Sequence, residues 1–107
     1  MARILGVDPG VTRLGLGVVD NPRGSEVVMV SVEVLTTPTD WDIAHRLLAL
    51  QKGVAETLDA HRPDAVALER VFAQHNVRTV MGTAQVSGIV IALAAERGIP
   101  VTHRTPS

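Results

Sequence analysis

Two carboxylates stand where they could bind a metal ion. Asp8 ends an apolar run at residues 3–8, and Glu69 ends a second one at residues 65–69. If these runs are neighbouring parallel strands, both side chains leave the same carboxyl edge of a sheet, where α/β folds usually bind ligands. Two close carboxylates repel each other unless a proton or a cation lies between them, and their oxygens suit Mg²⁺ or Mn²⁺. The alternative is that Asp8 bonds its own turn and Glu69 points to solvent.

The segment that follows Glu69 is basic. Residues 70–79 contain two arginines and no acidic residue, in a chain whose formal net charge is −1. A basic loop beside a carboxylate pair can hold a phosphate backbone over a metal ion. Phe72 in this loop could stack on a base or anchor the loop to the core. Arg13 could reach the same edge of the sheet or remain a solvated turn residue.

Apolar periodicity predicts an α/β fold with a mixed five-stranded sheet in a single domain over residues 1–107. Three strands joined by short turns should form an antiparallel meander near one edge of the sheet. Val28, Val30, Val32 and Val34 should share one face of the third strand. Thr39 and Asp40 can cap the first helix. The expected strands are 3–8, 14–20, 26–36, 65–69 and 100–103, with helices at about 40–62 and 79–97.

The second expected helix is apolar on nearly every face between Met81 and Ala95. A helix of that kind is buried on every face, and small residues let another helix approach closely. The small residues lie four apart, at Ala84, Gly88 and Ala92. We expect this stripe to form a dimer interface; the alternative is a cover by another helix of the same subunit.

Composition excludes several classes of protein. The chain of 107 residues has no cysteine, so it has neither disulfides nor a thiolate zinc site. Its four histidines lack the paired spacing of a zinc site, and the serine-hydrolase and P-loop motifs are absent. The N-terminus does not resemble a signal peptide, and the longest apolar stretch, residues 86–95, is too short to span a bilayer. We therefore expect a cytoplasmic protein without a membrane partner.

Three blocks of the chain resemble the RuvC family of bacterial Holliday-junction resolvases. The first is ILGVDPG at residues 4–10, followed by Thr12, Arg13 and Gly15. The second and more specific block is ALERVF at 67–72, Asn76, and TVMGTAQ at 79–85 with Gly88. The third is HRTPS at 103–107. The resemblance runs in register from one end of the chain to the other.

The resemblance implies an RNase H-like fold and a homodimer that nicks four-way DNA junctions in recombination and repair. Asp8 and Glu69 match the first two catalytic metal ligands of a site that uses two Mg²⁺ or Mn²⁺ ions. The expected DNA contacts are Arg13, Arg70, Phe72, Asn76 and Arg78, and the expected dimer contacts are Ala84, Gly88 and Ala92. The resemblance leaves open whether a branch-migration motor complex is a further partner.

One departure from the family affects activity. The family carries two further acidic ligands and several basic residues in a region that would follow Ser107. We therefore expect this chain to be the N-terminal part of a longer protein and inactive as a nuclease by itself. Two alternatives stay open. One is a catalytically inactive DNA- or partner-binding dimerisation domain. The other is a phosphate-binding domain of the actin-like or sugar-kinase type, which also opens on an Asp-x-Gly hairpin.

Overall fold

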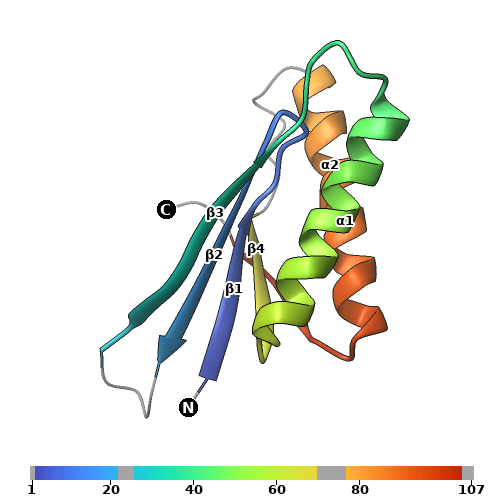
Figure 1. Cartoon of the computed structure of the whole chain (residues 1–107). Coiled ribbons are helices and arrows are strands. Elements are labelled where there is room, and N and C mark those ends of the chain that lie inside the picture. Colours follow the sequence, from blue (N-terminus) through green and yellow to red (C-terminus); the bar gives the residue numbers. More distant parts are fainter. Residues whose placement is uncertain (1, 22–25, 70–76, 105–107) are drawn as a thin grey trace.

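The computed structural model describes residues 2–21, 26–69 and 77–104 (Figure 1). Every element expected from the sequence is present, with ends that differ by no more than three residues. The strands are β1 Ala2–Asp8, β2 Arg13–Asn21, β3 Val28–Thr36, β4 Ala65–Glu69 and β5 Val101–Arg104, and the helices are α1 Ile43–His61 and α2 Val77–Glu96.

The five strands form one mixed sheet in the order β3-β2-β1-β4-β5. β1, β2 and β3 pair antiparallel, as short turns require, and β3 lies at the edge. β4 pairs parallel with β1 on one side and with β5 on the other. The expected meander, edge strand and parallel pair are therefore confirmed, and β1 and β4 end at the same edge of the sheet.

Both helices cover the same face of the sheet (Figure 1). The core lies between them and that face, where alternate residues of β1, β2 and β4 point inward. The fully buried side chains include Leu5, Leu14, Leu50, Leu68 and Val90. Among the described residues, no helix covers the opposite face, so the side chains that alternate with the core residues line an open sheet surface.

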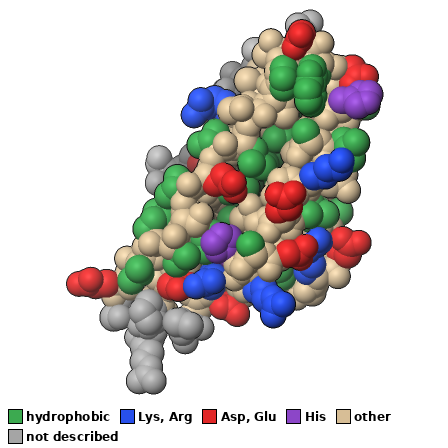
Figure 2. All heavy atoms as spheres, in the orientation of Figure 1, with side chains coloured by type: hydrophobic (Ala, Val, Ile, Leu, Met, Phe, Trp, Pro, Cys, Tyr) green, Lys and Arg blue, Asp and Glu red, His purple; other side chains and the backbone are tan. Residues whose placement is uncertain are grey.

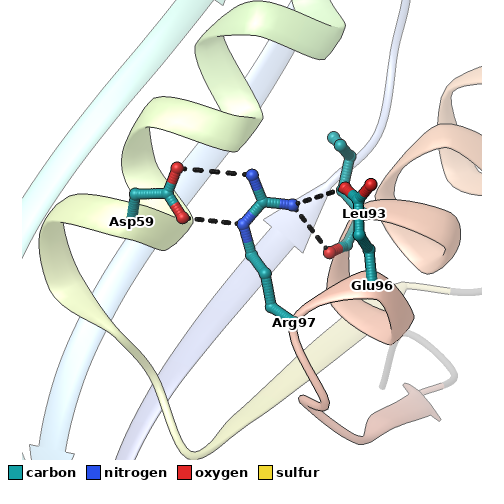
Figure 3. A network of polar contacts seen from close by, with 4 residues as sticks. All are labelled: Asp59, Leu93, Glu96 and Arg97. Carbon is teal, nitrogen blue, oxygen red and sulfur yellow. Dashed lines mark hydrogen bonds and ion pairs between the residues drawn. The ribbon is translucent and has the colours of Figure 1, made fainter.

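An ion-pair network joins the two helices at their C-terminal ends (Figure 3). The Arg97 guanidinium donates to both carboxylate oxygens of Asp59, at 2.7 and 3.3 Å, and to the Leu93 carbonyl at 3.0 Å. This hydrogen bonding to Arg97 lowers the pKa of Asp59. The network fixes the ends of α1 and α2 relative to each other, at the end of the helix pair opposite to the carboxyl edge of β1.

Two local expectations were wrong. The N-cap of α1 is Asp42, whose carboxylate accepts a hydrogen bond from the backbone N–H of His45, so Thr39 and Asp40 lie in the preceding turn. The valines of β3 do not all share one face, because the pairing register shifts between Val18 and Val19. A bulge of this kind inserts one extra residue and reverses the alternation beyond it. Val28 therefore faces opposite to Val32 and Val34.

Over Thr79–Glu96, α2 has the length and the apolar composition of a helix that could cross a membrane. The expectation from the sequence counted only residues 86–95, which Ser87 and Gly88 interrupt, whereas this window extends over 18 residues. Core helices of soluble proteins meet the same criterion, so it is weak evidence by itself. Val86, Val90 and Ala94 of α2 are buried in the core of the domain.

Candidate functional site

Asp8 and Glu69 come together at the carboxyl edge of the sheet. Asp8 is the last residue of β1, and Glu69 is the last residue of the parallel neighbour β4. The register pairs Val7 with Leu68, which places the next residue of each strand side by side. Because the side chains of Val7 and Leu68 point into the core, those of Asp8 and Glu69 point to the open face.

The two carboxyl groups are close enough to share a proton. A hydrogen bond with Asp8 raises the pKa of Glu69 above its ordinary value, and partial burial and the negative charge of Asp8 add to the effect. Two carboxylates in contact cannot both be ionised at low cost unless a cation replaces the proton. The pair is therefore a place where a cation would relieve a repulsion that the fold itself creates.

The raised pKa of Glu69 predicts how stability depends on pH without divalent cations. Its proton binds more tightly in the folded state, so the stabilisation is complete below the ordinary carboxyl pKa. It is lost as the pH rises through the raised pKa of the folded state. In EDTA, we expect the melting temperature to fall as the pH rises from the ordinary carboxyl pKa through the raised pKa of Glu69. Glu69→Gln should remove the part of this fall that comes from Glu69. Glu56 lies on α1, which covers the other face of the sheet, so Glu56→Gln should keep the wild-type dependence of melting temperature on pH. The same pH dependence in wild type, Glu69→Gln and Glu56→Gln would contradict the prediction.

Glycines leave the sheet surface beside Asp8 bare. Gly15 of β2 pairs with Asp8, and an ideal Cβ on Gly15 would lie 3.4 Å from the Asp8 Cβ. Gly6 and Gly17 pair with each other one step further along the same face. The open face next to the carboxylates is therefore largely backbone, which allows a bulky substrate to approach them closely.

A tight turn follows Asp8, and Gly10 makes it possible. An ideal Cβ on Gly10 would lie 2.5 Å from the carbonyl oxygen of Arg13, which no side-chain rotation can relieve. We expect Gly10→Ala to lower the free energy of unfolding by about 1–3 kcal/mol, as other overpacked substitutions do. Gly17→Ala is the matched control, because a Cβ there meets nothing within 4 Å. Urea denaturation of the two variants tests this, and equal midpoints would show that the turn absorbs the methyl group.

The donor chemistry of the pair fits one Mg²⁺ ion. Mg²⁺ in proteins is commonly held by one or two carboxylates, with water and substrate phosphate oxygens completing its shell. Among the described residues, no group of three or more acidic, histidine or cysteine side chains could hold a metal ion. The described part of the chain therefore offers two candidate ligands, Asp8 and Glu69, and a site for two ions would need donors beyond them.

The structure describes only some of the other residues expected in the site. Arg13 begins β2, is exposed, and lies at the same end of the sheet as Asp8. Arg70, Phe72 and Asn76 lie outside the described residues. Arg78 lies in the first turn of α2, and its side chain is not described. On the face seen in Figure 2, acidic and basic side chains are mixed, in agreement with the near-neutral charge of the chain.

The small-residue stripe on α2 faces outward. Ala84, Gly88 and Ala92 are all exposed, and a Cβ added to Gly88 would meet nothing within 4 Å. α1 packs against α2 but does not cover this stripe. The large side chain of Met81 is exposed as well. Among the described residues, no helix of the same subunit covers the stripe, so the alternative finds no support there, and a dimer interface stays the prediction.

Sequence reasoning missed Arg46. This residue lies on α1 and lines a cleft together with Arg13, which comes from a different element. Its guanidinium donates to the hydroxyl oxygens of Thr37 and Thr12, at 2.9 and 2.8 Å. A sequence shows only an arginine on an amphipathic helix, since the two threonines are 9 and 34 residues away.

Comparisons with known proteins converge on one family. The family model described as crossover junction endodeoxyribonuclease RuvC matches residues 4–107. Two curated proteins with this name, from Saccharopolyspora erythraea and Streptomyces coelicolor, are 62% and 57% identical over 105 residues. These alignments cover 98% of the chain and 53% and 56% of the relatives, so the chain spans about half the length of the curated relatives it matches.

A solved structure agrees with the sequence comparisons. The fold is similar to that of T. thermophilus RuvC, determined in complex with a Holliday junction substrate, with a TM-score of 0.90 and 30% sequence identity. The similarity covers 99% of this chain and 66% of the T. thermophilus chain. The expected mixed sheet of the RNase H-like type is thereby confirmed.

Proposed function

Because this chain belongs to the RuvC family of crossover junction endodeoxyribonucleases, we propose that the full-length protein containing it is a Holliday-junction resolvase. It would be a cytoplasmic, metal-dependent endonuclease that nicks four-way DNA junctions in recombination and repair. The family assignment also argues against the sugar-kinase type of phosphate-binding domain. The observation that carries the proposal is the contact between Asp8 and Glu69 at the carboxyl edge of β1 and β4.

In this proposal the carboxylates of Asp8 and Glu69 would hold Mg²⁺ or Mn²⁺. When bound, such ions supply the positive charge that activates a water molecule and stabilises the leaving 3′ oxygen. The contributions of the chain itself are to fix the two carboxylates on rigid strand ends and to keep the adjoining sheet surface bare at Gly15. The cleaved strand would approach from the open face, because both carboxylates point there.

We also propose that basic residues around this edge hold the DNA. Arg13 supports this, because it is exposed at the same end of the sheet as Asp8. Arg70, Phe72, Asn76 and Arg78 follow Glu69 within nine residues of the sequence. Phosphate contacts would set the position of the DNA, and Phe72 would stack on or wedge beside a base.

A homodimer through α2 completes the proposal. It is supported by the exposed stripe of Ala84, Gly88 and Ala92, where two helices could approach closely. Two active sites related by a two-fold axis would suit a junction that must be nicked in two strands. Sedimentation equilibrium of the full-length protein should give the mass of a dimer, and a monomer at micromolar concentration would contradict this part.

The test of the proposed function is cleavage by the full-length protein. A labelled four-way junction should be nicked in Mg²⁺ to give a product with a 5′ phosphate. The same junction should stay intact in EDTA, and a linear duplex of the same sequence should be cut far more slowly. Tight junction binding without cleavage in Mg²⁺ or Mn²⁺ would instead support the alternative of a catalytically inactive DNA-binding dimerisation domain.

A further inference from the structure

A cleft lies between the turn after β1 and the N-terminal parts of α1 and α2. Its volume is about 940 Å³, within the range of ligand-binding clefts. We call it the arginine cleft. The side chains most relevant to binding are those of Thr12, Arg13, Arg46, Met81, Thr83 and Gln85. They come from three elements that only the fold brings together.

The arginine cleft carries uncompensated positive charge. Arg13 and Arg46 line it, and none of the described residues that line it is acidic. Within the described part of the chain, neither arginine has a carboxylate within 4 Å, whereas Arg3 and Arg97 are each paired with an aspartate. Two guanidinium groups without counter-ions in one concave surface create a positive potential that attracts anions.

Arg46 is held in position to bind a ligand. Its Nε donates to the Thr37 hydroxyl and its Nη2 to the Thr12 hydroxyl, and the Thr37 hydroxyl in turn donates to the Val11 carbonyl at 2.6 Å. These two bonds leave three of the five guanidinium N–H groups without a protein acceptor among the described residues. A pre-positioned guanidinium loses little entropy when it binds, and its planar fork matches a phosphate.

The cleft lies close to the candidate active site. Thr12 follows Asp8 by four residues, so their Cα atoms are at most about 15 Å apart. Successive nucleotides of a strand in duplex DNA rise by about 3.4 Å, so this separation corresponds to a few nucleotides. A strand with one phosphate at Asp8 and Glu69 would therefore have another, a few nucleotides away, at the distance of Thr12, whose hydroxyl accepts a hydrogen bond from Arg46.

We propose that the arginine cleft is a second DNA-backbone site, in which Arg46 binds a phosphodiester a few nucleotides from the cleaved one. The proposal rests on the proposed function and adds a named contact to it. It commits to nucleic acid as the ligand, because the charge lies beside a candidate nuclease site and because Thr12 links Arg46 to the turn that follows Asp8. A free anion or a structural role for Arg46 would be revealed as an outcome of the test.

The test is the salt dependence of junction binding by the full-length protein in EDTA, where cleavage is blocked. We expect Arg46→Gln to weaken binding about tenfold, as loss of a hydrogen bond between charged groups does. The slope of log K against log salt concentration should fall by about 0.9, the contribution of one phosphate contact. Arg46→Lys, which keeps the charge, should restore the slope.

Two further variants separate a DNA contact from a structural role. Lys52→Gln removes an exposed positive charge from the same helix outside the cleft and should leave the slope unchanged. Thr37→Val removes an acceptor of Arg46 but keeps its charge, so it should also keep the slope. If Arg46→Gln fails to fold, Arg13→Gln replaces it, because that exposed side chain makes no hydrogen bond within the described residues.

The outcomes are distinct. If the salt-dependence slope of Arg46→Gln or Arg13→Gln equals that of Lys52→Gln, the arginine cleft is not a DNA site. Junction binding by the wild type would still support the proposed function. If Arg46→Gln and Thr37→Val both weaken binding and neither changes the slope, Arg46 has a structural role. This result also overturns the arginine cleft as a DNA site. Failure of the wild type to bind any junction overturns the proposed function together with this inference.

Discussion

Replacing Asp8 by Asn in the full-length protein should lower the rate of junction cleavage by about 10³-fold. A bound divalent cation contributes several kcal/mol of transition-state stabilisation, and each 1.36 kcal/mol changes a rate about tenfold. In the proposed site, the amide would remove one of the two carboxylate charges that hold the cation, so most of this stabilisation would be lost. Single-turnover cleavage of a labelled four-way junction in Mg²⁺ measures the effect.

The prediction for Asp8 carries internal controls. Asp40→Asn, an exposed carboxylate in the turn before α1, should cleave at the wild-type rate. The double variant of Asp8→Asn and Glu69→Gln should be hardly slower than either single variant, because residues that act as a unit are not additive. Multiplicative effects of the two substitutions, or wild-type cleavage by Asp8→Asn, would contradict a shared metal site.

The same substitution should not weaken the fold. Asp8 and Glu69 repel each other in the absence of a cation, so Asp8→Asn removes a source of instability. The melting temperature of the variant in EDTA at pH 7 should therefore equal or exceed that of the wild type. A large decrease would mean that the loss of cleavage reflects unfolding rather than loss of a metal ligand.

Leu50→Ala should cause one of the largest losses of stability in the molecule, about 2–5 kcal/mol in the free energy of unfolding. Leu50 of α1 is 1% exposed and belongs to the core between the helices and the sheet. Its removal leaves a cavity that the surrounding strands can fill only in part. Urea denaturation of wild type and variant measures the loss.

Leu48 provides the matched control on the same helix. It is 46% exposed, so Leu48→Ala makes the same chemical change outside the core. Its effect should stay within about 0.5 kcal/mol, as for most surface substitutions. Similar midpoints for the two variants would show that α1 does not pack as described, and a changed m-value would indicate an altered unfolded state.

The sequence by itself determined the elements and placed Asp8 and Glu69 at strand ends. Residues 3–8 form an apolar run that stops at Pro9 and Gly10, and the run at 65–69 is short and apolar. Both patterns predict strands. Short turns allow only antiparallel neighbours, and the helix between β3 and β4 allows a parallel crossover. This pattern places Asp8 and Glu69 at the ends of two strands, and the parallel pairing of β1 with β4 in this register decides that the two side chains meet.

Tertiary structure alone decided the details that depend on long-range packing. The bulge in β3 depends on how that strand pairs with Val18 and Val19 of β2, and no turn residue in the sequence marks its position. Asp42 rather than Asp40 caps α1 because the preceding turn is longer than the local pattern indicates. In the arginine cleft, Arg46 is held by hydrogen bonds to Thr12 and Thr37, which lie in distant parts of the sequence. Local apolar patterns specify which segments are strands and helices, whereas contacts between distant residues exist only once the chain has packed.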